Sequence, residues 1–82
     1  MNDLIEKIIG ANIRRLRTSA GLTQEQLSAR LQVRGCDITR SALAKIEVGQ
    51  RHLYPDELIL IKEILNVSYE EILKLENNDE SR

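Results

Sequence analysis

Apolar residues in this chain recur at steps of three and four, and no stretch alternates with period two for long enough to form a strand. The longest periodic stretch, residues 4–20, predicts an amphipathic helix. Its apolar stripe consists of Ile5, Ile8, Ile9, Ile13, Leu16 and Ala20. Lys7 and Arg14 fall on the opposite face. Gly21 follows the stripe, and because glycine commonly ends helices in the left-handed conformation, the helix is expected to end there.

A second helix is predicted directly afterwards. Thr23 and Gln26 have the spacing of a capping box, in which each side chain satisfies a free backbone N–H of the other residue. This signal predicts a helix over residues 24–32. Residues 33–37 contain a glycine and show no helical period, so they are expected to form a loop.

The third predicted helix begins at Thr39, a suitable N-cap, and ends at Gly49. On a 3.6-residue wheel its inward side carries Ala42, Leu43 and Ile46. Its outward side carries Ser41, Ala44, Lys45 and Val48, with Arg40 and Glu47 on the two shoulders. The outward side is polar enough to contact solvent or a polar partner.

Two further helices complete the chain. Pro55 suits the first position of a helix that Asn66 can close, and Ser68 with Glu71 forms another capping box. The apolar residues of these helices are Leu58, Ile61, Ile64 and Leu65, followed by Ile72, Leu73 and Leu75. The pattern therefore predicts one all-α domain of five helices over residues 1–76, with a polar tail over residues 77–82.

Composition agrees with one small soluble domain. The chain has 82 residues, of which 41% are hydrophobic and 30% charged, and two tyrosines are its only aromatic residues. The core must therefore be aliphatic. Charge is unevenly distributed, because residues 1–52 contain nine Lys/Arg against five Asp/Glu, a balance of +4, whereas residues 53–82 contain three against eight, a balance of −5. A basic part followed by an acidic part hints at a surface that binds a polyanion.

Catalysis has little support in the sequence. Cys36 with His52 as a base lacks any recognisable signature, and a single cysteine is usually a small apolar residue. The adjacent acids Asp56 and Glu57, like Glu70 and Glu71, point away from each other on a helix and are interpreted as helix N-terminal charges. We expect no enzyme activity, no catalytic residue, no metal site and no cofactor.

Targeting signals are also missing from the sequence. No apolar run approaches the roughly 20 residues of a membrane span, and the start of the chain does not have the pattern of a signal peptide. The expected location is therefore the cytoplasm, with no membrane partner.

A helix, a turn and a second capped helix form the arrangement in which the later helix enters the major groove of DNA. Arg40, Ser41 and Lys45 are residue types that contact base edges, since Arg and Lys donate to guanine and Ser pairs with several bases. The alternative is that these residues form an ordinary solvated helix face. Periodicity alone does not separate the two interpretations.

Two segments carry a specific resemblance. Residues 13–27, IRRLRTSAGLTQEQL, and residues 44–51, AKIEVGQR, resemble the helix-turn-helix domain of phage repressor and Cro proteins, the XRE family. The resemblance extends over about residues 8–73 and implies a five-helix, lambda-repressor-like DNA-binding fold. One feature departs from it, because the connection over residues 31–39 is about five residues longer than the usual tight turn. The longer connection is expected to affect the angle at which the third helix lies in the fold.

The resemblance also implies roles for individual residues. The base-reading positions would be Arg40, Ser41 and Lys45. The phosphate contacts would come from Gln24, Arg51 and His52. Arg34, in the longer connection that departs from the family pattern, would add another phosphate contact; the alternative is that it is an ordinary solvated loop arginine. Arg17 and Glu47 would form a partly buried ion pair that joins the first helix to the third, and both residues lie at the edges of their apolar stripes.

These roles imply a sequence-specific transcriptional regulator of the repressor type, bound to double-stranded DNA as a homodimer. Leu73 and Leu75 are candidates for the dimer contact. No small-molecule effector is expected, because the chain is too short to hold a ligand-binding domain as well. The alternative function is a protein-interaction or antitoxin-like adaptor whose acidic C-terminal part binds a partner protein.

Overall fold

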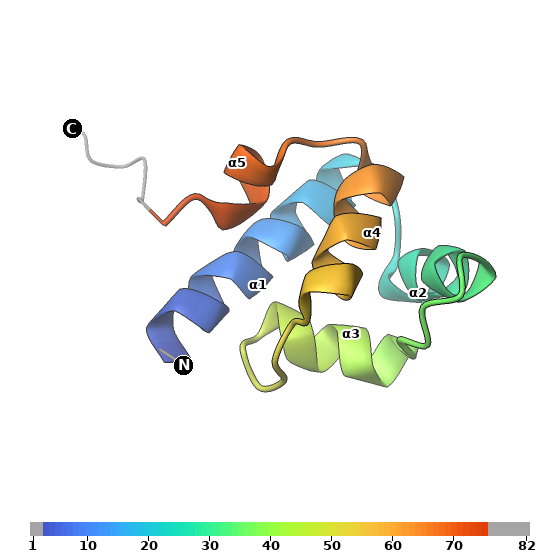
Figure 1. The fold of residues 1–82 in the computed structure, drawn as a ribbon, viewed down its shortest axis with the longest axis horizontal. Helices are drawn as coiled ribbons and strands as arrows, with labels where there is room; N and C mark the ends of the chain where they lie inside the picture. Colours follow the sequence, from blue (N-terminus) through green and yellow to red (C-terminus); the bar gives the residue numbers. More distant parts are fainter. Residues whose placement is uncertain (1–2, 76–82) are drawn as a thin grey trace.

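The computed structural model describes residues 3–75, and over that range the chain forms helices and no strand. In chain order they are α1 (Asp3–Ser19), α2 (Gln24–Val33), α3 (Arg40–Glu47), α4 (Pro55–Leu65) and α5 (Tyr69–Leu73). Figure 1 shows α1 running diagonally behind α4, with α3 and α5 on opposite sides of it. The predicted all-α class is confirmed. The tail predicted for residues 77–82 lies outside the described residues.

The capping signals are present where the sequence predicted them. The Thr23 hydroxyl accepts a hydrogen bond from the Gln26 N–H at 3.0 Å, and the Gln26 side chain accepts one from the Thr23 N–H at 2.9 Å. Ser68 and Glu71 make the same reciprocal pair of bonds at the start of α5. Asn66 ends α4 in the left-handed conformation, with φ 57°. These bonds satisfy backbone groups that a helix end leaves without partners.

The last helix is shorter than the apolar pattern indicated. α5 ends at Leu73, so Leu75 lies beyond its end and is exposed. The Asn12 side chain of α1 donates hydrogen bonds to the carbonyls of Ile72 at 2.8 Å and Lys74 at 2.9 Å. An amide from another helix therefore satisfies carbonyls that otherwise lack helical partners, and it fixes α5 on α1.

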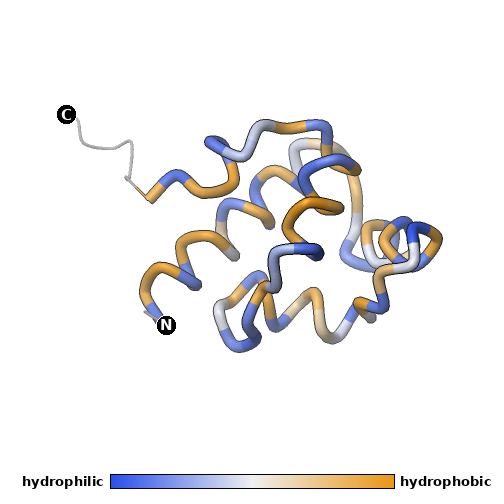
Figure 2. Tube along the Cα trace, in the orientation of Figure 1, coloured by the Kyte–Doolittle hydropathy of each residue, from blue (hydrophilic) through white to orange (hydrophobic). Residues whose placement is uncertain are grey.

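The core is aliphatic, as the composition predicted. Every helix contributes to it, and so does the connection between α2 and α3. Its buried members are Ile13, Leu16, Leu27, Leu31, Cys36, Ile38, Leu43, Ile46, Ile61, Leu65 and Ile72. Both tyrosines are exposed. Figure 2 shows hydrophobic and hydrophilic residues alternating along α1, the pattern of a helix with one buried face.

The long connection between α2 and α3 is anchored to the rest of the fold. Cys36 and Ile38 are buried in the core, and the Gln32 side chain donates to the Ile38 carbonyl at 3.1 Å. Arg34 forms an ion pair with Glu63 on α4. The additional residues therefore hold α3 in a defined position instead of leaving it on a loose loop.

Close contact with α1 also positions α3. α1 packs on α3 and α5, while α2 packs on α3 and α4. At the crossing of α1 and α3, a Cβ atom on Gly10 would lie 2.2 Å from the Ile46 carbonyl oxygen. Only a glycine lets the two backbones approach this closely.

Candidate nucleic-acid interface

α3 is held by its cap and by two buried side chains. The Thr39 hydroxyl accepts a hydrogen bond from the Ala42 N–H at 3.1 Å, which fixes the first turn. Leu43 is fully buried and Ile46 is 2% exposed, so one side of the helix faces the core. With that side fixed, the opposite side of α3 must face solvent.

The outer side of α3 carries the residues expected to contact bases. Arg40, Ser41 and Lys45 are all exposed, and Val48 next to them is 52% exposed. Within residues 3–75, none of the three polar side chains forms an ion pair or a hydrogen bond. Their polar groups are therefore free to contact a partner from outside the chain.

Behind this surface, Arg17 and Glu47 lie in direct contact. Arg17 Nε donates to Glu47 Oε2 at 2.7 Å and Arg17 Nη2 donates to Glu47 Oε1 at 3.0 Å. Arg17 Nη1 donates to the Leu22 carbonyl at 2.8 Å, and the Gln24 side chain donates to Glu47 Oε1 at 3.0 Å. The Glu47 carboxylate thus accepts three hydrogen bonds. These bonds connect the end of α3 to α1 and to the start of α2.

Arg51, an expected phosphate contact, has partners within the protein. Its Nη1 and Nη2 donate to the two oxygens of Glu57 at 2.9 and 3.1 Å, and Nη1 also donates to the His52 carbonyl at 2.9 Å. Burial would raise the pKa of Glu57, but hydrogen bonds from Arg51 and from the Tyr54 N–H outweigh it, and the pKa is lowered. The pKa of Arg51 is raised, first by its hydrogen bond to Glu57. Arg51 is therefore a fixed cation beside α4.

The other two expected phosphate contacts, His52 and Arg34, also have acidic neighbours. His52 Nδ1 lies 2.7 Å from a carboxylate oxygen of Glu6 on α1, and the His52 side chain is 65% exposed. Arg34 pairs with Glu63, and each of these side chains is nearly half exposed. The Arg34–Glu63 pair is exposed and therefore weak, so a phosphate can displace it at little cost, whereas the Glu6 side chain beside His52 is only 12% exposed.

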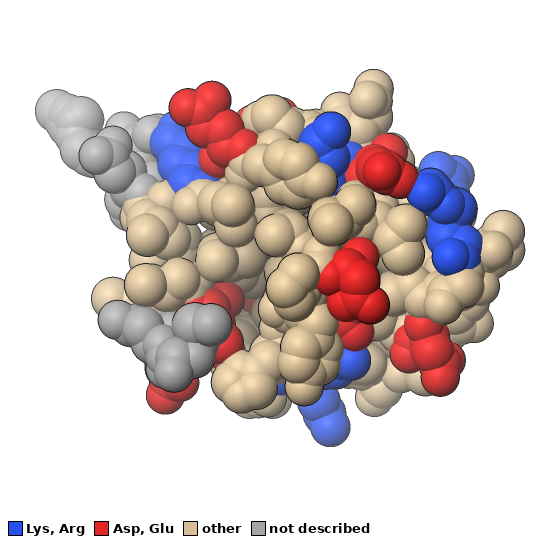
Figure 3. Space-filling model, viewed as in Figure 1, with Lys and Arg blue, Asp and Glu red and all other residues tan. Residues whose placement is uncertain are grey.

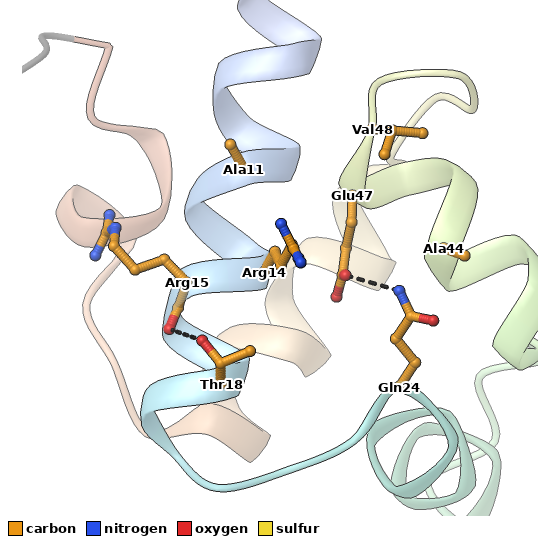
Figure 4. Close-up of a pocket in the computed structure, with 8 residues that line it drawn as sticks. All are labelled: Ala11, Arg14, Arg15, Thr18, Gln24, Ala44, Glu47 and Val48. Atoms are coloured by element: carbon orange, nitrogen blue, oxygen red, sulfur yellow. Dashed lines mark hydrogen bonds between the residues drawn. The ribbon is translucent and has the colours of Figure 1, made fainter.

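An open groove lies between α1, the start of α2 and α3 (Figure 4). Its lining residues are Ala11, Arg14, Arg15, Thr18, Gln24, Ala44, Glu47 and Val48. In Figure 4 the Arg14 side chain points into the gap toward Glu47, whereas the Arg15 side chain points away toward α5. Ala44 and Val48 belong to the outer side of α3, so the groove is continuous with that surface.

Charges on the face over α4 are mixed. Figure 3 shows acidic and basic side chains interspersed there among uncharged residues. This face therefore offers no continuous cationic surface.

Cys36 is buried, and burial, with further contributions from Glu57 and Asp56, raises the pKa of its thiol. A raised pKa disfavours the reactive thiolate. No group of three or more His, Cys, Asp or Glu side chains within residues 3–75 could hold a metal ion. None of the helices described is both long and apolar enough to cross a membrane.

The sequence interpretation missed one residue at this surface. Glu57 was assigned only as a charge at a helix start, yet it is 8% exposed and holds Arg51 in place. Its three-residue spacing from Tyr54 is that of a capping box, and the Tyr54 N–H donates to Glu57 Oε1 at 3.0 Å. Because tyrosine is not a usual cap residue, that spacing carried no signal.

Comparison with known protein families gives a match over most of the chain. A family model described as helix-turn-helix, HTH_3, matches residues 13–72, which are 60 of the 82 residues. The matched range includes α2, the anchored connection, α3 and α4. No curated protein and no solved structure matches the chain.

Proposed function

This chain belongs to the helix-turn-helix family of DNA-binding transcriptional regulators, and we propose that it is a repressor that recognises a specific DNA sequence through the outer side of α3. The observation that carries the proposal is the exposure of Arg40, Ser41 and Lys45 on one capped helix. The major groove admits an α-helix, and its base edges present acceptors that Arg and Lys side chains fill.

Base contacts and phosphate contacts have different tasks in this proposal. Arg40, Ser41 and Lys45 contact bases and so set the preferred sequence. The side chains that contact phosphates and set the register on the duplex are Gln24, Arg34, Arg51 and His52. Gln24 already donates to Glu47, so its orientation is fixed before DNA arrives. Such preorganisation reduces the entropy lost on binding.

A homodimer completes the proposal. One domain of this size covers little DNA, and two half-sites about 34 Å apart allow two copies to bind one face of the duplex. Leu73 and Leu75 are 41% and 48% exposed, which supports their assignment as the dimer contact.

The decisive experiment is selection of bound duplexes from a random pool. We expect one enriched sequence in two related half-sites, whose separation gives the geometry of the dimer. Replacing Arg40 or Lys45 with Ala should relax the preference at particular base pairs, at about 1–3 kcal/mol each. Lys62→Gln, which removes a cation from α4, is the control and should leave the preference unchanged.

The salt dependence of binding separates this function from that of a protein-interaction adaptor. Binding through several phosphates weakens steeply as salt rises. A protein that fails to bind duplex DNA even at low salt would contradict the proposal and favour the adaptor.

A further inference from the structure

Two cations on α1 have no role in the interface described so far. Lys7 and Arg14 are both exposed, and neither forms an ion pair or a hydrogen bond within the described range 3–75. At 100° per residue, positions 7, 11, 14 and 18 fall within about 60° of arc. Lys7, Ala11, Arg14 and Thr18 therefore form one face of α1, here called the α1 strip.

The α1 strip lies beside α3. Ala11, Arg14 and Thr18 line the groove, whose other wall includes Ala44 of α3 and Val48, the residue directly after α3. At the far end of the strip, the side-chain stem and backbone of Lys7 lie against the turn after α3, because a Cβ atom on Gly49 would be 2.5 Å from Lys7 Cγ. The strip therefore lies beside the C-terminal half of α3 and the turn that follows it.

The groove beside the strip has an excess of positive charge. Its one carboxylate, Glu47, is neutralised by Arg17 and accepts a further bond from Gln24, and its side chain is only 1% exposed. Arg14 adds a charge that no ion pair within residues 3–75 balances, and Figure 4 shows its side chain pointing into the gap. A charge in this position attracts an anion from solvent.

Geometry identifies that anion as a DNA phosphate. The major groove is about 12 Å wide and an α-helix with its side chains measures about 10–12 Å, so a helix in the groove has a phosphate backbone along each side. α1 flanks α3 on the side of the open groove. An element in that position must face one of the two backbones.

We propose that the α1 strip is a second phosphate-binding surface, in which Arg14 and Lys7 contact the backbone beside the base pairs that α3 recognises. Ala11 between them is small, so the backbone can approach α1 closely. The inference deepens the proposed function and depends on it. Contacts from Arg14 and Lys7 increase the affinity for DNA and help to set the register of the protein on the duplex. They do not distinguish one base sequence from another.

The test measures how salt weakens binding to a fluorescein-labelled random-sequence duplex for the full-length protein and its variants. Each phosphate contact contributes about 0.9 to the slope of log K against log salt. We expect Arg14→Gln and Lys7→Gln each to lower that slope by about 0.9. Arg14→Lys should restore it, and Lys62→Gln on α4, which removes a cation from outside the proposed interface, should not change it.

Two further measurements separate the loss of a phosphate contact from a loss of folded protein and from a loss of sequence recognition. Thermal melts followed by circular dichroism show that each variant is folded, as expected for exposed positions. Arg14→Gln should weaken binding to a selected sequence and to random duplex by the same factor, because a phosphate contact does not depend on the base sequence.

Failure of this inference differs from failure of the proposed function. Wild-type protein that does not bind duplex at low salt would contradict the function itself, and the strip with it. Wild-type protein that binds with a steep salt slope, while both Gln variants keep the same slope, would overturn the strip alone. A change in only one variant would overturn the assignment of the other residue.

Discussion

Arg17 and Glu47 join α1 to α3 through two parallel hydrogen bonds, 2.7 Å from Nε to Oε2 and 3.0 Å from Nη2 to Oε1. Their side chains are 8% and 1% exposed, so water does not compete for either charge. Because the same carboxylate accepts from Gln24, the pair also fixes the start of α2. The mutual orientation of the two helices in the helix-turn-helix therefore depends on one buried acid.

Glu47→Gln tests that dependence. The substitution leaves the Arg17 guanidinium buried without a counter-charge, and breaking a buried pair in this way costs about 3 kcal/mol of the free energy of unfolding. Urea denaturation gives the value. Glu63→Gln, which breaks the exposed pair with Arg34, is the control and should cost about 0.5 kcal/mol or less. An equal loss of unfolding free energy in the two variants would contradict the claim that the fold depends on the Arg17–Glu47 pair.

Gly10→Ala should destabilise the protein although alanine is the better helix former. In an open helix, Gly to Ala gains about 1 kcal/mol. Here the new Cβ would lie 2.2 Å from the Ile46 carbonyl oxygen, so α1 and α3 must separate. We expect a net loss of about 1–3 kcal/mol, typical of overpacking. A gain in melting temperature would contradict the close approach of the two backbones.

Much of the fold could be predicted because its signals are local. Thr23 with Gln26 and Ser68 with Glu71 each span three residues, so the sequence alone shows the bonds that start α2 and α5. The aliphatic stripes predicted the buried side of α3, and with it the exposure of the outer side.

Contacts between distant parts of the chain could not be predicted in this way. Gly10 has no pattern that reveals its approach to Ile46 before the crossing of the helices is known. The pairing of Arg51 with Glu57 crosses from a loop to a helix, and no periodicity relates the two positions. The family resemblance implied a phosphate contact for Arg51, but only the three-dimensional structure reveals its internal partner, Glu57.

Protonation of Glu57 is expected to reduce the stability of the folded protein in acid. Its pKa is lowered in the folded protein from an ordinary value of 4.5, so the unfolded chain binds the proton more tightly. The contribution of Glu57 to stability is therefore complete above pH 4.5 and is lost as the pH falls through the lower folded pKa. Unfolding free energies of wild type and Glu57→Gln, measured across this range, should converge in acid. A constant difference would contradict the assignment.

Arg51 and Glu57 together offer a matched pair of variants for DNA binding. Arg51→Gln removes the ion pair and the cation, whereas Glu57→Gln removes the same ion pair and leaves the cation free to meet a phosphate. We expect Arg51→Gln to weaken binding to all duplexes and to lower the salt slope by about 0.9. Glu57→Gln should bind at least as tightly as wild type. Equal weakening by both variants would show that Arg51 acts only through the fold.

Leu75→Lys tests the proposed dimer. Leu75 is 48% exposed and lies beyond the end of α5, so a lysine there leaves the core intact while placing a charge in the proposed contact. Sedimentation velocity should show wild-type dimer and variant monomer, and only binding to duplexes with two half-sites should weaken. Val33→Lys is the control, because Val33 is 87% exposed at the end of α2. Dissociation by both substitutions, or by neither, would remove Leu75 from the dimer contact.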